Sequence, residues 1–454
     1  MGIKDFHKWI KQDYRNCVKS YWLSEYDHCY IDLNYALHFI SFMLTDKDDI
    51  YEKVYSFIME ILKTTLPNKS LTLAIDGVPP LSKLLTQRKR RLDKALSSKD
   101  DENKKINTIM FTPGTKFMDE LEENMKPYFN RIKKLYNIKI NILMTDVDEA
   151  EIKLKNQLVK NMKNDKNNTH IFVSSDADVI VMLMALDNLS KIFILNKSFK
   201  DISIIYLGSL INEHIKKVGC SLHPNLDFTA VNIFLGNDYL PKLSFLTIEK
   251  LWMAYKNTLI NHPKGFIIDN IQVNKIFLIK LLFNIIQLTK QNMFKIDRNI
   301  KSSKNYFDGY IWCLNMYVNG SCERYDYFYH KNNGLPQPFQ MILELINNNN
   351  LLIKKNNNQE NCVPINKKLY TILVLPKKYS NLIQYLNEKY KKFIDKNSII
   401  YKIETCEKCK LIRNNVSYTE EENKKKLLLH KKKHSDISEN DIIKINKKYK
   451  KIFV

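Results

Sequence analysis

The stretch THIFVSSDADVIVMLMAL (169–186) passes from an apolar strand through an acidic turn into an apolar helix. CYIDLN (29–34) and LTLAIDG (71–77) have the pattern of buried strands that end in an aspartate, and KIFIL (191–195) has that of a fourth strand. Helical patterns lie between these strands, at residues 50–66 and 149–162. Strands that alternate with helices predict an α/β fold, in which a largely parallel sheet is flanked by helices.

Acidic residues follow several of these strands. The acids at strand ends or strand-to-helix junctions are Asp32, Asp76, Glu149, Glu151, Asp176, Asp178 and Asp238. Ligands bind beyond the carboxyl ends of the strands in such a sheet. Carboxylates that gather there without histidine or cysteine indicate two bound Mg²⁺ or Mn²⁺ ions, and a pair of such ions can catalyse the hydrolysis of phosphodiesters. The alternative is that each acid only ends a strand or caps a helix, as Asp176 and Asp178 could for a helix that begins at Val179.

A basic helix is predicted after Asp76, over LSKLLTQRKRRLDKAL (81–96). The polar residues that share one face of this helix are Lys83, Gln87, Arg90 and Arg91. Two guanidinium groups, an ammonium group and an amide suit a terminal phosphate. A solvated basic face is one alternative, and a nuclear localisation signal in QRKRR is another.

The composition points to a nucleic-acid partner. The 454 residues carry a formal net charge of +23, which favours a polyanion, although lysine-rich codon usage is an alternative. The beginning of the sequence has no apolar leader, and no stretch approaches about 18 consecutive apolar residues. We therefore expect a soluble protein with reduced thiols, and the cytoplasm as its compartment, with the nucleus as the alternative.

Several of these blocks, taken in order, resemble the XRN family of 5′→3′ exoribonucleases over roughly residues 1–255, with a weaker similarity up to about residue 335. The similar blocks are MGIKDFHKWI, CYIDLNYALH, AIDGVPPLSKLLTQRKRRL, FTPGTKFM, SSDADVIVML and FLGNDYLPKL. The resemblance implies a PIN/FEN-like nuclease core. It also implies a Mg²⁺-dependent enzyme that degrades single-stranded RNA with a 5′-monophosphate to mononucleotides, in mRNA turnover.

The resemblance also assigns site residues. The family's metal ligands fall on the seven acids above, with DEAEIKL (148–154) in place of a GEGEHKI block, so that two glycines and a histidine are lost. The 5′-phosphate pocket falls on the basic helix face at residues 83, 87, 90 and 91. His38 matches a histidine that stacks on the first base, with helix packing as its alternative. RYDYFYH (324–330) places Tyr327, or Tyr325, where the family has a stacking tryptophan.

The chain is expected to have four parts. They are an XRN-like nuclease domain (1–255), a helical extension that completes the site (256–345), an Asn/Lys-rich linker (346–365) and a basic, mostly helical C-terminal region (366–454). The last part contains a Cys-x2-Cys and His-x3-His set with zinc-ligand spacing, Cys406, Cys409, His430 and His434. The alternative for its histidines is a solvated lysine-rich helix.

Two other functions fit part of the pattern. One is a flap-endonuclease-like DNA nuclease, which shares a carboxylate-lined site, and the other is a catalytically inactive RNA-binding scaffold. Retention of all seven acids argues against the scaffold, since an idle site has no reason to gather carboxylates. The short chain fits a minimal, virus-like member of the family, and a monomer is the simplest expectation.

Overall fold

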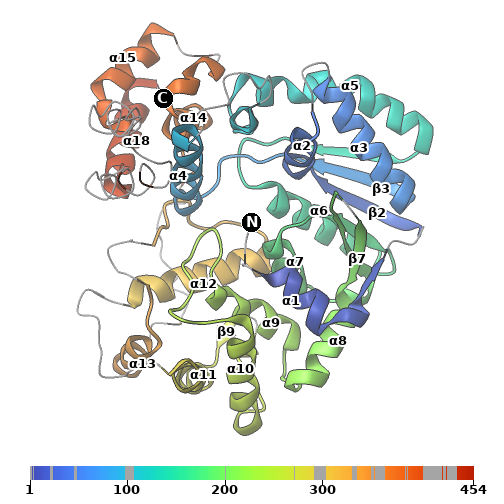
Figure 1. Cartoon of the computed structure of the whole chain (residues 1–454), viewed down its shortest axis with the longest axis vertical. Coiled ribbons are helices and arrows are strands. Elements are labelled where there is room, and N and C mark those ends of the chain that lie inside the picture. Colours follow the sequence, from blue (N-terminus) through green and yellow to red (C-terminus); the bar gives the residue numbers. More distant parts are fainter. Residues whose placement is uncertain are drawn as a thin grey trace. The chain divides into compact units, whose positions relative to one another are not determined.

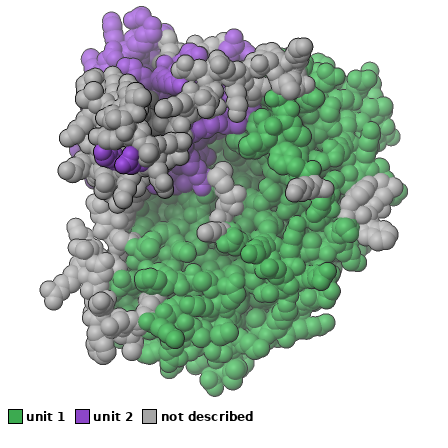
Figure 2. Space-filling view, in the orientation of Figure 1, with its two compact units in different colours: residues 1–83, 124–364 green, residues 84–123, 365–454 purple. Residues whose placement is uncertain are grey.

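The protein is described here by a computed structural model. It describes all residues except 1, 2, 4, 21–23, 45–48, 98–106, 200, 270, 291–302, 330–334, 349–351, 353–362, 384, 386, 402–421, 423–425, 427–436 and 454. Its chain forms two compact units (Figure 2), one of residues 1–83 and 124–364 and one of residues 84–123 and 365–454. No helix within the described ranges combines the length and the apolar run that crossing a bilayer requires.

A seven-stranded sheet organises the first unit (Figure 1). Its strands are β1 (Val18–Ser20), β2 (Tyr26–Asp32), β3 (Pro67–Ala74), β4 (Lys139–Leu143), β5 (His170–Val173), β6 (Ile192–Lys197) and β7 (Ile202–Tyr206). They lie in the order β1-β7-β6-β5-β2-β3-β4, and the pairs from β6 to β4 are parallel. Strands β7 and β1 are antiparallel additions at one edge. The predicted largely parallel sheet is therefore confirmed.

The central strands are covered on both faces. Consecutive residues of β2, Cys29, Tyr30 and Ile31, are fully buried although their side chains point to opposite faces. Helices α2 (Leu33–Ser41) and α6 (Ala150–Asn164) both contact β2 and β3. Burial on two faces explains why these strands are continuous apolar runs rather than alternating ones.

Further helices of the first unit surround this sheet or extend it. They are α1 (Phe6–Asp13), α3 (Ile50–Thr65), α7 (Ala177–Met184), α8 (Leu207–Val218), α9 (Pro224–Asn232), α10 (Ile248–Asn261), α11 (Lys275–Thr289), α12 (Lys304–Asn319) and α13 (Pro338–Asn347). A short hairpin of β8 (Ile267–Asp269) and β9 (Gln272–Val273) precedes α11.

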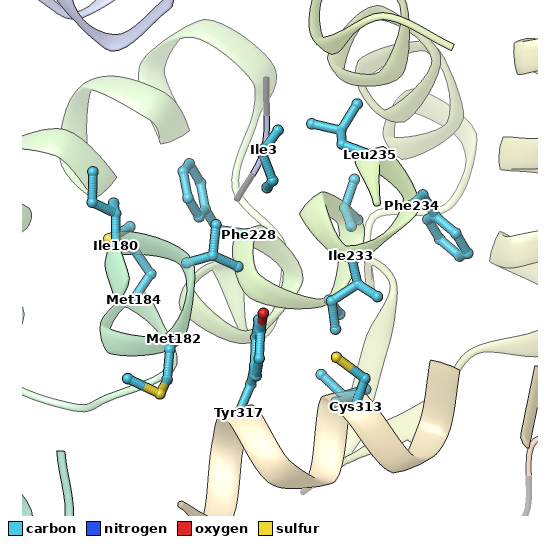
Figure 3. Packing of buried hydrophobic residues seen from close by; sticks show 14 of the residues in the cluster. Ile3, Ile180, Met182, Met184, Phe228, Ile233, Phe234, Leu235, Cys313 and Tyr317 are labelled. Atoms are coloured by element: carbon cyan, nitrogen blue, oxygen red, sulfur yellow. The ribbon is translucent and has the colours of Figure 1, made fainter. Parts of the chain in front are cut away.

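One apolar core joins the sheet to the helices that follow it. Figure 3 shows Met182 of α7, Phe228 of α9, Phe234 of the 3₁₀ turn η5 (Ile233–Leu235) and Tyr317 of α12 in this core. The residues expected as a helical extension thus pack into the same core as the sheet. The first unit includes them up to residue 364.

The second unit is helical over its described residues. It contains most of α4 (Leu81–Ser97), the start of α5 (Lys116–Tyr136), η3 (Thr108–Phe111), α14 (Lys367–Val374), η7 (Lys377–Leu382), α15 (Glu388–Lys396), η8 (Ser398–Tyr401) and α18 (Glu439–Phe453). Buried Arg88 of α4 donates to the carbonyls of Leu373 and Ile400. Residues 84–123 therefore pack with the C-terminal helices, a grouping that differs from the four expected parts.

Candidate active site

Two of the acids stand between a strand and a helix. Asp32 ends β2 and caps α2, because its Oδ1 accepts hydrogen bonds from the backbone N–H groups of Asn34 (2.7 Å) and Tyr35 (3.2 Å). Asp176 caps α7 in the same way and accepts from the N–H of Asp178 at 3.0 Å. Capping and ligand binding are therefore not exclusive here, since each carboxylate keeps a second oxygen.

Asp76 is fixed from two elements. Its carboxylate accepts a hydrogen bond from the side-chain amide of Asn34 (3.0 Å) and one from the backbone N–H of Ala150 (3.0 Å) at the start of α6. The Asn34 side chain in turn accepts from the Asp76 N–H at 3.2 Å. Asn34 thus aligns the ends of β2 and β3, a role that sequence reasoning missed because it depends on a tertiary contact.

Gly77 permits the close approach of the loop that precedes α6. A Cβ at this position would lie 2.6 Å from the carbonyl carbon of Asp146. The backbone N–H of Gly77 donates to the carbonyl of Asp148 at 2.7 Å. The glycine after Asp76 therefore brings the chain that carries Glu149 and Glu151 up to the end of β3.

Three carboxylates converge at this point. Asp76, Glu149 and Glu151 each offer an oxygen within 4.8 Å of those of the other two. Glu149 immediately precedes α6, and Glu151 is in its first turn. The glycines and histidine that DEAEIKL lacks do not prevent this gathering. An all-oxygen set of this kind fits a hard divalent cation.

Lys83 connects this group to the acid of the GNDYLP block. Its ammonium pairs with Glu149 and lies 3.3 Å from Oδ2 of Asp238. The Tyr239 hydroxyl donates to Glu149, and the Lys83 ammonium lies 5.8 Å from the centre of the Tyr239 ring. Lys83, Glu151, Asp178 and Tyr239 all line one small pocket.

Asp238 is held in place by the turn around it. The side chain of Asn237 accepts hydrogen bonds from the N–H groups of Tyr239 and Leu240, both at 2.9 Å. Gly236 has a φ of 81°, a left-handed conformation that side chains disfavour. These two residues explain why a glycine and an asparagine precede the acid.

Burial makes the carboxylates of Asp32 and Asp178 hard to ionise. It is the largest influence on Asp178, whose pKa lies well above its ordinary value, and the charges of Asp176 and Asp238 raise it further. Burial and the charge of Asp76 likewise raise the pKa of Asp32. Oδ1 of Asp178 is buried and has no hydrogen-bond partner among the described residues. A bound cation would offset the repulsion between these carboxylates and would give the buried Asp178 oxygen a partner.

Lys83 is the main opposing charge. Burial raises the pKa of Glu149 to about 7 against the effect of the Lys83 ammonium. Burial alone would lower the pKa of Lys83, but the charges of Glu149, Glu151 and Asp238 outweigh it, so that this pKa lies well above its ordinary value. Lys83 therefore stays charged and supplies part of the neutralisation that the acids require.

Lys153 is a further polar residue at the site that the sequence did not single out. Its ammonium donates to the carbonyls of Ile75 (2.8 Å) and Thr145 (2.7 Å) and so ties the ends of β3 and β4 together. Burial lowers its pKa to about 8, while the charge of Asp76 opposes this. No pattern in DEAEIKL distinguishes it from an ordinary helix lysine.

The remaining residues of the predicted phosphate pocket belong to the second unit. Gln87 accepts a hydrogen bond from the Tyr370 hydroxyl, and Nε of Arg91 donates to Thr112 Oγ1 at 2.7 Å. Arg90 lies on the same helix, α4. Of the four residues, Lys83 alone belongs to the unit that carries the acids.

The two predicted stacking residues differ. His38 is exposed on α2, as a base-stacking role requires. Tyr327 is 2% exposed, packs at 4.7 Å on Trp312 and donates to the carbonyl of Asn305 at 2.9 Å. The prediction for Tyr327 is therefore wrong, because its ring has no free face. Tyr325, the alternative, is half-buried and donates to Asp148.

The predicted zinc ligands Cys406, Cys409, His430 and His434 lie outside the described residues. They stay a prediction from spacing alone.

Comparison with known proteins adds a family match. Residues 1–198 match the family described as XRN 5′-3′ exonuclease N-terminus. The chain is 24% identical over 334 residues to 5′-3′ exoribonuclease 1 of Saccharomyces cerevisiae, which covers 60% of this chain and 22% of the yeast protein. It is 29% identical over 153 residues to the human protein of the same name, covering 29% of this chain and 9% of that protein. The chain thus aligns with about a fifth or less of each of these two relatives.

Similar solved structures include the catalytic core of Rad2 in complex with DNA substrate, at 13% identity and a TM-score of 0.38, covering 76% of this chain and 94% of that one. Another is T5 5′-exonuclease with bound divalent zinc ions, at 11% identity and a TM-score of 0.36, covering 71% of this chain and 99% of that one.

Proposed function

We propose that this chain, whose residues 1–198 match the family described as XRN 5′-3′ exonuclease N-terminus, is a 5′→3′ exoribonuclease that removes mononucleotides from RNA with a 5′-monophosphate. The convergence of Asp76, Glu149 and Glu151 at the end of β3 is the observation that carries this proposal. Decay of decapped mRNA in the cytoplasm is the setting that we propose for it.

The acids would hold the divalent ions. Asp76, Glu149 and Glu151 form one group of oxygen ligands, and Asp32, Asp176, Asp178 and Asp238 supply the others. Two bound Mg²⁺ ions would activate water and stabilise the leaving oxygen of the phosphodiester. The buried and unpartnered oxygen of Asp178 supports this assignment, since a buried carboxylate without a donor is costly.

The protein's own side chains would prepare the site. Tyr239 orients Glu149 through its hydroxyl, and Asn34 orients Asp76. Lys83 balances the charge of Glu149 and Asp238, and its ammonium can also attract a phosphate group. We further propose that Lys83, Gln87, Arg90 and Arg91 recognise the 5′-phosphate and that His38 stacks on the first base. Each cleavage would then create a new 5′-phosphate for the same pocket.

The test compares matched RNAs that bear a 5′-monophosphate, a 5′-hydroxyl or a 5′-triphosphate, each with Mg²⁺ or with EDTA. Mononucleotides should be released from the monophosphorylated RNA alone, and EDTA or Asp178→Ala should abolish their release. Asp269→Ala, a change of an exposed acid in β8, is the matched control and should leave the rate unchanged. Cutting of DNA flaps instead would replace the proposal with a structure-specific nuclease, and RNA binding without cleavage would replace it with a scaffold.

A further inference from the structure

Three large apolar side chains are exposed just after helix α2 and just after strand β6. Phe42 follows the end of α2 and is 77% exposed, Met43 is 53% exposed, and Phe199 follows the end of β6 and is 61% exposed. Phe42 meets the Phe199 ring edge-on, at 6.1 Å and 88°. We call Phe42, Met43 and Phe199 the aromatic surface. Folding alone does not account for it, since exposed rings contribute little to a core.

The rings are held in position from below. Phe199 stacks on Phe39 at 4.6 Å and 18°, and Phe39 is buried against Phe57 of α3. The Tyr35 hydroxyl donates to the carbonyl of Lys197 at 2.6 Å, which ties α2 to the residues after β6. The aromatic surface is therefore a supported platform with its outer faces open to solvent.

The aromatic surface lies on the same edge of the sheet as the acids. Strand β6 runs parallel to β5, and β5 runs parallel to β2, so the carboxyl ends of these strands lie side by side. Asp32 follows β2, Asp176 follows β5, and Phe199 follows β6. Helix α2 starts at Asp32 and carries His38 and, one turn later, Phe42. The platform thus continues the surface on which the first base is proposed to stack.

We propose that Phe42 and Phe199 form a stacking subsite for unpaired RNA nucleotides that lie 3′ of the nucleotide being removed. This proposal rests on the proposed function, because the subsite would be reached only by a strand whose 5′ end is bound at the acids and which continues along the carboxyl edge of the sheet. Aromatic rings stack on any base, so that the subsite would bind RNA without sequence preference, as an exonuclease requires. The net charge of +23 complements the phosphates of such a strand.

Stacking of a base on an aromatic ring contributes to the affinity for single-stranded RNA. Phe42→Ala and Phe199→Ala should each weaken binding of a 5′-monophosphorylated 12-nucleotide RNA by about 10-fold. Neither change should alter the affinity for a 5′-monophosphorylated dinucleotide, which is too short to reach the subsite. Binding is measured by fluorescence anisotropy in EDTA, with the full chain. Phe42→Trp should restore the affinity, and RNA should quench its fluorescence. Phe283→Ala, which removes an exposed ring on α11, is the control.

Three outcomes would overturn the subsite. They are unchanged affinity for the longer RNA, an equal loss for both RNAs, and self-association of the wild type that Phe42→Ala abolishes without changing RNA binding. The last would make the aromatic surface a contact between two copies of the chain. Binding is measured without metal and does not depend on catalysis. If the protein had no exonuclease activity, the proposed function would be wrong, but the difference in affinity between the 12-nucleotide RNA and the dinucleotide would still test the subsite.

Discussion

The buried polar side chains at the two ends of the central sheet have different neighbours. At the amino ends of β2 and β5, the rings of His28 and His170 stack at 5.1 Å. Nδ1 of His28 pairs with Ser70 at 2.8 Å, and Nδ1 of His170 pairs with the Tyr30 hydroxyl at 3.0 Å. At the carboxyl ends, acids face other acids, and an oxygen of Asp178 has no partner among the described residues.

Burial acts on both ends, but with different results. It lowers the pKa of both histidines, that of His170 to about 3, so that these rings stay neutral and hydrogen-bonded at neutral pH. It raises the pKa of Asp178 and Asp32, whose neighbours are also acids. The histidines of the amino end are therefore neutral and each is hydrogen-bonded through Nδ1, although Nε2 of His170 is buried without a partner among the described residues. The carboxyl end, by contrast, gathers acids and is costly until a cation binds. We infer that the histidines at the amino end serve folding and that the acids at the carboxyl end serve function.

The largest expected effect is on the acid with the unpartnered oxygen. Asp178→Asn should lower the exonuclease rate by about 1,000-fold or more, because the amide cannot replace a carboxylate as a cation ligand. The same change should raise the melting temperature of the metal-free protein, because it removes a buried like charge. Cleavage rates measured with 5′-labelled RNA check the first expectation, and thermal melts in EDTA check the second.

Asp227→Asn is the matched control for the stability effect. Asp227 is also buried, but it accepts hydrogen bonds from the Tyr255 hydroxyl and from the N–H groups of Phe266 (3.0 Å) and Ile267 (2.7 Å). Its loss should destabilise the protein by about 1–3 kcal/mol. If both variants shifted the melting temperature in the same direction, the contrast between complete and incomplete acids would be wrong.

The next effect concerns the cation that the protein itself supplies. Lys83→Met should lower the exonuclease rate by about 100-fold and destabilise the metal-free protein by about 3 kcal/mol, because Glu149 and Asp238 would lose their counter-charge. Urea denaturation with and without Mg²⁺ measures this, and Mg²⁺ should restore part of the loss. Lys83→Arg keeps the charge and should stay close to the wild type in stability. Equal stability of Lys83→Met and the wild type in EDTA would refute this role.

The smallest effect is at the amino end and depends on pH. A histidine whose folded-state pKa is depressed stabilises the protein above pH 6.5, and this contribution is lost as the pH falls from 6.5 towards the folded-state pKa. From pH 7 to pH 5, the His170 contribution should fall by about 1–2 kcal/mol. Since the raised pKa of Asp32 acts in the opposite direction, the measured quantity is the difference between the wild type and His170→Asn. A difference that did not change with pH would contradict a neutral buried ring.

Much of the site could be predicted because its residues follow short, strongly patterned strands. The four predicted strands correspond to β2, β3, β5 and β6, and the acids after them meet because parallel strands end at one edge. The edge strands β1 and β4, and β7 next to β1, were not predicted, since they are short and partly exposed.

What could not be predicted depends on contacts between distant parts of the chain. Asn34 and Lys153 have no distinguishing pattern, and only their hydrogen bonds to Asp76 and to the ends of β3 and β4 give them roles. Tyr327 lies in an aromatic sequence that fits a stacking platform equally well, and its packing on Trp312 decides against it. Arg88 reads as one more basic residue, yet it is buried against carbonyls near the other end of the chain.

Titration of Mn²⁺ into the metal-free protein, followed by calorimetry, tests most directly whether the carboxyl end of the sheet is a cation site. Wild type should bind Mn²⁺, and Glu151→Gln should weaken this binding by about 10-fold or more, because it removes one of the three converging carboxylates. His28→Asn, at the opposite end of the same sheet, should bind Mn²⁺ as the wild type does. Unchanged Mn²⁺ affinity in Glu151→Gln would contradict the account.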